Sequence, residues 1–527
     1  MIGVIATNHS QYATRLVVAA LRRSFSATQV GQVALGALET IALDTLVAIN
    51  PDESVSECLL SWLKSGARKL ILLGSLPDSI VDTLNIKLCD RPSDFSVSAA
   101  SQPAAPRQSS SSGIIVQYGP KAAALGAGHW QRPLERFDFA SEWNNEGYGA
   151  VRADGSIWAL ATSFCVPPEN ELASLLLDSE YLGSYAALFN HGDSSILWYN
   201  RAVGPIDSYE WRLVEKFLAS WRHEVLPCNP VLHEIPWGYD SAITMRLDCD
   251  EDIESARPLW DAYREMGIPF SVAIHTTTLR DKRHHSILRE MTDAGESILS
   301  HSATHAVNWG GSYQAALSEA KTAAAEIRSV ADFYPRYAVS PFHQSPPYAL
   351  VALADAGYQG CIGGIIRNDP EFLMARGGLV ADLPRGFIGH SQQCMLHGDC
   401  MLEQGDPLHV YKRAFDRAYE TMTFFGYLDH PFSERYQYGW KDEEERIEAH
   451  INLVRHIRSK ASRPIFLGEN EAMDFLFWKA EHNIVSKNGT FHLIVSASND
   501  RWGEARMTPT LEYRGQLFEA TPDGFAL

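Results

Sequence analysis

The chain has 527 residues, and its 45 Lys and Arg against 64 Asp and Glu give a net charge of −19. At roughly 150 residues per domain, this length predicts about three domains. A hydrophobic fraction of 45% with 21% charged residues is typical of globular proteins and excludes a disordered or fibrous chain. The acidic balance argues against nucleic acid as a partner, because nucleic-acid surfaces need Lys and Arg to neutralise phosphates.

The sequence predicts no membrane span. Its apolar runs are far shorter than the ~18 residues that a crossing helix needs. The first residues, MIGVIATNHS, lack the basic start and long apolar run of a signal peptide. The eight cysteines are scattered, with no CxxC pair. We therefore expect reduced thiols and a cytoplasmic location, or a periplasmic or secreted one if a leader has been trimmed away.

Strands and helices alternate in the first part of the chain. The segments IGVIAT, TLVAIN and KLILLG read as strands, separated by helices over 12–25 and 54–64. This order predicts a parallel sheet covered by helices. A Ser-, Ala- and Pro-rich stretch at 91–113 predicts a flexible segment, and an amphipathic helix at 207–222 closes the unit. We expect residues 1–235 to form a three-layer α/β domain, similar in topology to glutamine-amidotransferase-like or flavodoxin-like folds, with a structural or sugar-binding role.

A regular βα repeat begins near residue 243. Its strands are ITMRLD, IPFSVAI, YAVS, CIGGII and TFFGYLD, and two of its helices end at Gly267 and Gly295. Repeats of this size predict a distorted (β/α) barrel over residues 236–479. Residues 480–527 read as antiparallel strands and predict a small β-rich C-terminal appendage.

Two clusters of chemically capable side chains follow strands of this repeat. Asp248 and Asp250 end one strand, and His301 and His305 follow another. Because the carboxyl ends of parallel strands meet on one side, both clusters are expected at the same rim. Two imidazoles four residues apart share one face of a helical turn, and with one carboxylate they suit Zn²⁺ while leaving positions for water.

Ordinary structural roles are the alternative for each cluster. Glu251 or Asp252 could cap the next helix, and an isolated histidine pair is as often solvated as metal-binding. Together, on neighbouring strand ends, the two clusters favour a metal site. Asp248 and Asp250 lie two apart in an extended segment, so one can bind the ion while the other acts beside it as a base.

The stretch REMGIPFSVAIHTTTL, followed by ILREMTDAGESILSHSATH, resembles the core of the polysaccharide deacetylase family. This family comprises carbohydrate esterase family 4 and its relatives, which share the nodulation-protein-B homology fold. HSATH fits the family's His-[Ser/Thr]-x-x-His form, and the resemblance covers residues 243–478. The Asp-x-Asp spacing is similar to that of a divergent branch that includes deacetylases of galactosamine-containing exopolysaccharides.

The resemblance implies a role for each residue of the two clusters. It makes Asp248 the general base, and it makes Asp250, His301 and His305 the ligands of a divalent metal. The family usually has adjacent aspartates, whereas Cys249 intervenes here, which leaves Asp252 as a spare candidate. Zinc is the expected ion, with cobalt, nickel or manganese also accepted by such a site.

Two later segments match further motifs of the family. Residues 337–342 lie where the family has Arg-x-Pro-Tyr, so the resemblance implies that the backbone N–H of Phe342 helps to form an oxyanion hole. The motif's arginine is replaced by Val339, and Arg246 is a hypothetical substitute for it. The segment LDHP matches the last motif, which implies that Leu428 borders the acetyl pocket and that His430 is the general acid.

The resemblance implies a hydrolase that removes N-acetyl groups from the amino sugars of a polysaccharide or glycan. A deformylase or cyclic-amide hydrolase acting on a small or lipid-linked substrate would use the same site. The alternative that is not an enzyme is a carbohydrate-binding protein whose catalytic site has decayed. The absence of the arginine of the Arg-x-Pro-Tyr motif suggests it.

Several aromatic and polar side chains near the motifs have no assigned role. His275 reads as a core or rim histidine, and Trp309 and Trp440 could stack on a sugar or pack in the core. Four further loop residues could line the cleft: His343, His390, His397 and Asp399.

Overall fold

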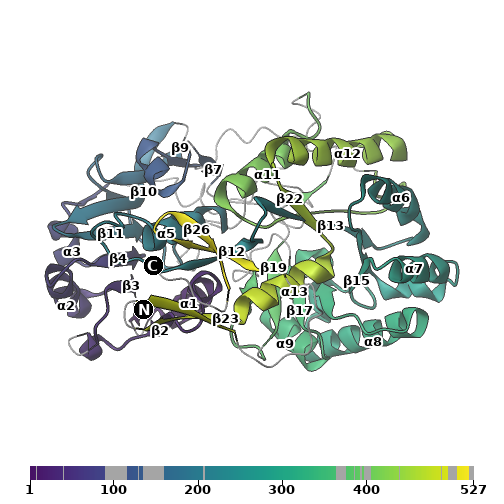
Figure 1. The fold of residues 1–527 in the computed structure, drawn as a ribbon, viewed down its shortest axis with the longest axis horizontal. Coiled ribbons are helices and arrows are strands. Elements are labelled where there is room, and N and C mark those ends of the chain that lie inside the picture. The colour runs from purple at the N-terminus through teal and green to yellow at the C-terminus, as the bar shows by residue number, and fades with distance from the viewer. Residues whose placement is uncertain are drawn as a thin grey trace.

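The structure is a computed structural model. It describes residues 1–527 except 8, 39–40, 90–114, 129, 134–159, 178, 206–207, 364–375, 385, 392–393, 397–404, 438, 488–489, 496–506 and 522–527. The chain folds as a mixed α/β protein with two large sheets, which lie in the two halves of the view in Figure 1. The predicted flexible segment 91–113 lies outside the described residues.

The first sheet contains the predicted parallel strands and an antiparallel extension. Its order is β2-β1-β3-β4-β11-β10-β9-β6-β7. Strands β2, β1, β3, β4 and β11 run parallel, and the remainder pair antiparallel, which the sequence pattern did not predict. The strands are β1 (Ile2–Ala6), β2 (Val30–Gln32), β3 (Thr45–Ile49), β4 (Lys69–Leu73), β6 (Ile115–Tyr118), β7 (Gln131–Pro133), β9 (Glu171–Leu177), β10 (Glu180–His191) and β11 (Ser194–Tyr199).

Helices cover both faces of the parallel part, as expected for a three-layer arrangement. Successive strand residues point to opposite faces, so Val47 packs in the core with α1 (Gln11–Phe25) and α5 (Ser208–Ala219). Leu46 packs in a second core with α2 (Glu53–Lys64) and α3 (Asp78–Thr83). Beside this sheet, β5 (Lys87–Leu88) pairs with β8 (Phe164–Cys165).

A disulfide joins these two short strands. Cys89 follows β5 and bonds to Cys165 of β8. The prediction of reduced thiols is therefore wrong for this pair. The spacing of the two cysteines along the chain carried no sign of the bond, because 76 residues separate them.

The second sheet carries the predicted βα repeat. Its order is β18-β19-β17-β16-β15-β14-β13-β21-β20, with β22 also paired to β13, and only β18 runs antiparallel to its neighbour. Over the described residues β18 and β20 are the two ends of this path, so the barrel is not closed by hydrogen bonds there. The strands are β13 (Ser241–Cys249), β14 (Ser271–Ile274), β15 (Ser297–Ser300), β16 (Tyr337–Val339), β17 (Gly360–Gly363), β18 (Gly378–Leu379), β19 (Ile388–Ser391), β20 (Cys394–Met395), β21 (Phe425–Asp429) and β22 (Pro464–Leu467).

The helices of the repeat lie around this sheet (Figure 1). Glycines end two of them where predicted: Gly267, with φ of 66°, follows α6, and Gly295, with φ of 82°, lies just beyond α7. The helices are α6 (Arg257–Met266), α7 (His284–Asp293), α8 (Tyr313–Ala331), α9 (Pro347–Asp355), α11 (His409–Thr421), α12 (Glu443–Lys460) and α13 (Glu469–Ala480). No helix in the described part of the chain combines the length and apolarity that a membrane crossing requires.

The C-terminal strands are antiparallel, as expected. One hairpin consists of β23 (His482–Lys487) and β24 (Thr490–Val495). The other, β25 (Pro509–Tyr513) and β26 (Gln516–Glu519), adds to β12 (Val231–Pro236), the strand that connects the two large sheets. The end of the chain thus pairs with a strand from its middle. The predicted domain boundaries at residues 235 and 479 stay a prediction.

A buried ion pair joins the two sheets. Arg376, just before β18, donates from Nε and Nη2 to the carboxylate of Glu215 on α5 at 2.9 and 2.8 Å, and both side chains are fully buried. Burial alone would raise the pKa of Glu215, but the charge of Arg376 outweighs it and lowers the pKa to about 2. The pair therefore holds an ionised carboxylate in the interior.

We expect Glu215→Gln to lower the free energy of unfolding by about 3 kcal/mol, because it removes the carboxylate hydrogen-bonded to the buried Arg376 and leaves only Glu234, at 3.8 Å, to balance its charge. Urea unfolding measures this. In the wild type, the contribution of the pair is present above the ordinary pKa of glutamate and is lost as the pH falls towards 2, because protonation then favours the unfolded chain. Glu448→Gln, an exposed partner of Arg455, should change stability by less than ~1 kcal/mol. Equal effects of the two substitutions would contradict this account.

Candidate active site

The carboxyl ends of four parallel strands meet at one edge of the second sheet. Strand β13 ends in the Asp248–Asp250 segment, β15 leads to His301 and His305, β16 leads to Phe342, and β21 leads to His430. All the predicted site residues except Leu428 line one narrow pocket of about 30 Å³. The complete lining is Asp248, Asp250, His301, His305, Ser340, Phe342, His343, Met395, His430, Arg435 and Tyr436.

Three of these side chains converge as metal ligands would. Asp250 Oδ1 lies 3.5 Å from His301 Nε2 and 3.5 Å from His305 Nε2, and the two nitrogens are 3.1 Å apart. Ligands bound tetrahedrally at ~2.0–2.1 Å from a zinc ion would be about 3.3 Å apart. Asp250 Oδ1 is buried and receives no hydrogen bond from the described residues. The three residues therefore fit a divalent ion.

Both histidine rings turn a nitrogen towards Asp250. His301 Nδ1 donates to the carbonyl of Val339 at 3.1 Å, which fixes the ring with its Nε2 facing Asp250. Burial and the nearby His301 lower the pKa of His305 to about 3, so its ring is neutral. A neutral imidazole is the form that ligates a metal.

The prediction that a helical turn brings the histidines together is wrong. Residues 301–306 form an irregular loop in which Ser302 and His305 have φ of 64° and 53°. Glu319 of α8 holds this loop by accepting hydrogen bonds from the backbone N–H groups of Ala303 and Thr304 at 3.0 and 2.8 Å. Convergence therefore depends on an irregular loop that the following helix holds in place, and not on helical periodicity.

Arg246 orients Asp248. Its Nε and Nη2 donate to the two carboxylate oxygens at 2.6 and 3.3 Å, and both side chains are buried. Burial alone would raise the pKa of Asp248, but the charge of Arg246 holds it well below the ordinary value. On its other side, Arg246 Nη1 lies 3.8 Å from Glu469 of α13. Arg246 is thus the buried cation that contacts Asp248 directly, and its role as a substitute for the motif arginine stays a hypothesis.

His430 lines the pocket beside Asp250. Its Nε2 lies 3.7 Å from Asp250 Oδ2. Its backbone is held by Asp429, whose carboxylate accepts from the His430 N–H at 2.8 Å, and by Arg446, which donates to its carbonyl. Asp429 in turn accepts from Nε2 of the buried His450 at 3.1 Å. Buried charged groups therefore position the segment that carries His430.

Tyr436 is a site residue that the sequence did not reveal. Its hydroxyl donates to Asp250 Oδ2 at 2.9 Å, and its ring stacks on His430 at 4.4 Å between centroids. This bond engages Oδ2, the oxygen that is not turned towards His301 and His305, so it directs Oδ1 towards those two rings. Tyr436 begins the segment YQYGW, of which the sequence singled out only Trp440, because nothing in the spacing indicates which aromatic ring turns inward.

We expect Tyr436→Phe to weaken metal binding about tenfold, because a hydrogen bond that orients a ligand is typically worth 10- to 100-fold in affinity. Competition with a chromophoric chelator measures the change. Tyr334→Phe is the matched control, since Tyr334 is exposed and its hydroxyl contacts Arg328 on the surface. Unchanged affinity in Tyr436→Phe would show that Asp250 is oriented without this hydroxyl.

Two consecutive residues in a strained conformation border the histidines. Phe342 and His343 have φ of 52° and 56°, a region that few residues other than glycine adopt. The Phe342 ring packs on His305 at 4.4 Å between centroids, and His343 lines the pocket, where burial lowers its pKa to about 4. Strain of this kind is typical of functional sites.

The remaining candidates lie outside the pocket. Leu428 is buried in β21, and Met395 of the adjacent strand lines the pocket instead. Asp252 Oδ1 accepts from the backbone N–H of Ser255 at 3.2 Å, which is a capping role. Cys249 points into the hydrophobic core, as strand alternation predicts.

The other aromatic and histidine candidates have structural surroundings. Trp309 and Trp440 are buried, so neither presents a face to a sugar. His275 Nδ1 donates to the carbonyl of Asp250 at 3.1 Å, which makes it a support of the site. His390 is buried in β19. His397 and Asp399 lie outside the described residues.

Comparison with protein-family models found no match, and no curated protein matches the sequence. Among solved structures, a Mycobacterium smegmatis protein named as a polysaccharide deacetylase is 11% identical, with a TM-score of 0.37 over 46% of this chain and 92% of that one. PuuE allantoinase is 14% identical, with a TM-score of 0.35 over 47% and 93%. A family 4 acetyl xylan esterase from Clostridium thermocellum, in complex with a cobalt ion, is 12% identical, with a TM-score of 0.30 over 44% and 91%. The deacetylases found are of the family that the motifs in residues 243–478 resemble.

Proposed function

We propose that this chain is a metal-dependent hydrolase that removes N-acetyl groups from the amino sugars of a polysaccharide or glycan. The observation that carries the proposal is the spacing of Asp250 Oδ1, His301 Nε2 and His305 Nε2 at 3.1–3.5 Å, with Asp248 held beside them by Arg246. A base next to a ligand set that leaves coordination positions open is the equipment for hydrolysing an amide.

Asp250, His301 and His305 would hold the ion. When bound, a divalent ion polarises a carbonyl oxygen and makes water more acidic. Zinc is our first choice, because two imidazoles and one carboxylate suit it.

Asp248 would act as the base. Its Oδ2 lies 3.9 Å from His301 Nε2, so it is next to the ligand set without belonging to it. Arg246 keeps it ionised, which leaves it ready to take a proton from the water that attacks the acetyl carbon.

His430 would act as the acid. It lines the same pocket as Asp248, where it would give a proton to the nitrogen of the broken C–N bond. The Phe342 segment borders the carbonyl side, where its backbone N–H would face the developing oxyanion. The products are acetate and a free amine, and the narrow pocket suits an acyl group as small as acetyl.

Acetate release from N-acetylhexosamine oligomers tests the proposal. We expect release by the protein as isolated, loss of release after treatment with a chelator, and recovery on adding Zn²⁺. A free amine should appear in equal amount. Release that survives complete metal removal, or no release by the zinc-loaded protein, would overturn the proposal.

A further inference from the structure

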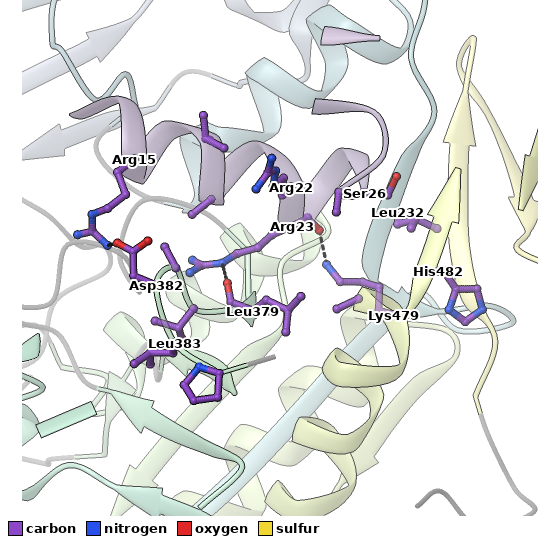
Figure 2. A pocket seen from close by; sticks show the side chains of 18 of the residues that line it. Arg15, Arg22, Arg23, Ser26, Leu232, Leu379, Asp382, Leu383, Lys479 and His482 are labelled. Carbon is purple, nitrogen blue, oxygen red and sulfur yellow. Dashed lines mark hydrogen bonds and ion pairs between the residues drawn. The ribbon is translucent and has the colours of Figure 1, made fainter. Parts of the chain in front are cut away.

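A second and larger cavity lies away from the site and is shared by the two sheets. It has a volume of about 330 Å³ and shares no lining residue with the Asp248 pocket. Figure 2 shows its walls: α1 of the first sheet on one side, and the segment 378–384 with the end of α13 on the other. This volume is at the lower end of the ~300–1,000 Å³ that small-molecule sites occupy.

The lining combines an apolar surface with an excess of positive charge. Four basic side chains border the cavity, Arg15, Arg22, Arg23 and Lys479, against the single carboxylate of Asp382. Most of the remaining wall is apolar and includes Val18, Leu232, Leu379, Leu383 and Ala480. Such a lining suits a ligand with one anionic end and one apolar end.

Lys479 is the lining residue that most strongly indicates an anionic ligand. It is 2% exposed, and its Nζ donates to the carbonyl of Arg23 at 2.7 Å. Among the described residues no carboxylate lies within 4.0 Å of Nζ. A buried ammonium is costly unless it is paired, and burial lowers the pKa of Lys479 to about 8 even though Glu234 and Glu215 act in the opposite direction. An anion in the cavity would provide the missing partner.

The ion pair at the opposite side of the cavity shows that this surface already attracts carboxylates. Arg15 Nη1 lies 3.2 Å from Asp382 Oδ2, and the two side chains are 32% and 72% exposed (Figure 2). Asp382 has φ of 60°, and its carboxylate faces Arg15 of α1. A ligand anion would compete with Asp382 for the same cationic wall.

We infer that this cavity binds a small organic anion, a carboxylate or a phosphate monoester on an apolar group, and that Lys479 and the α1 arginines hold its charged end. Because α1 belongs to one sheet and α13 to the other, the bound anion would connect the two sheets. If the anion binds the folded chain and not the unfolded one, the melting temperature should rise with ligand concentration and keep rising beyond saturation, because the stabilisation grows with the logarithm of the concentration.

Calorimetric titration and thermal unfolding of the full chain test the inference. The probes are phenyl phosphate and benzoate, with benzyl alcohol as the neutral match and inorganic phosphate as the anion without an apolar group. We expect at least one aromatic anion to bind saturably and to raise the melting temperature, while benzyl alcohol and inorganic phosphate bind at least about tenfold more weakly. The tighter of the two anions identifies the acidic group.

Substitutions then locate the binding. Lys479→Met keeps the aliphatic stem and should weaken the anion at least about tenfold. Asp382→Asn, which asparagine's tolerance of positive φ allows, should tighten it, because a competing carboxylate is removed. Asp261→Asn, an exposed partner of Arg264 on α6, is the matched control and should change nothing.

Three outcomes would overturn the inference. They are the absence of saturable binding by either anion, equal binding of benzyl alcohol, and unchanged affinity in both Lys479→Met and Asp382→Asn. If circular dichroism shows that Lys479→Met does not fold, Arg22→Gln takes its place, because Arg22 is exposed and its one contact from Nη2 is to the carbonyl of Val30. Unchanged affinity in that variant would be equally decisive.

Discussion

The substitution of either site histidine by alanine should remove the metal and nearly all turnover. His301 and His305 each supply one of three converging ligand atoms, and two remaining ligands hold an ion poorly. The ion contributes several kcal/mol to the transition state, and at about 1.4 kcal/mol per factor of ten the loss corresponds to about 10³-fold in kcat. Elemental analysis of the purified variants and acetate release measure the two effects.

His223→Ala is the matched control for both variants. His223 is half-exposed, and within the described residues its one ion pair is with the neighbouring Glu224. This variant should keep one metal ion and full turnover. Stoichiometric metal in His301→Ala or His305→Ala would rule out the Asp250, His301 and His305 ligand set.

Asp248→Asn should separate metal binding from catalysis. The amide keeps the shape of the carboxylate but cannot accept the proton, so we expect the metal content to stay near wild type while kcat falls about 10²- to 10⁴-fold. Asp252→Asn is the matched control, because Asp252 caps a helix start and contacts His284 outside the pocket. Full turnover in Asp248→Asn would show that another residue acts as the base.

The pH profile tests how Arg246 acts on Asp248. In the wild type the low pKa of Asp248 keeps it ionised through the neutral range, so its protonation should not limit kcat/KM above pH 5. In Arg246→Gln, Asp248 stays buried but loses the positive charge beside it. Because burial disfavours the ionised carboxylate, the pKa of Asp248 should rise. The acid limb of kcat/KM should therefore move to higher pH. An unmoved limb would show that Arg246 has only a packing role.

The alternation of β13 is consistent with the hypothesis that Arg246 acts on Asp248. Residues two apart in a strand share a face, which places Arg246, Asp248 and Asp250 on one side and turns Cys249 into the core. The strands and helices themselves follow from apolar periodicity and from glycines such as Gly267. These features depend on neighbours within a few residues, so they are present in the sequence.

Other contacts at the site join segments that lie far apart in the chain. Tyr436 contacts Asp250, which lies 186 residues earlier in the chain. The pairing of β25 with β12 and the Cys89–Cys165 bond also join remote segments. No spacing rule predicts such pairs, because each depends on the packing of whole layers.

The sequence alone settled the alternation of strands and helices, the carboxylates on one face of β13, and the pair of histidines beyond β15. Only the tertiary structure decided that Asp250 Oδ1 and the two Nε2 atoms come within 3.5 Å of one another, and that a cationic cavity opens between α1 and α13. Periodicity acts through the backbone over a few residues, whereas a separation of a few ångströms between remote side chains is set by how the layers pack.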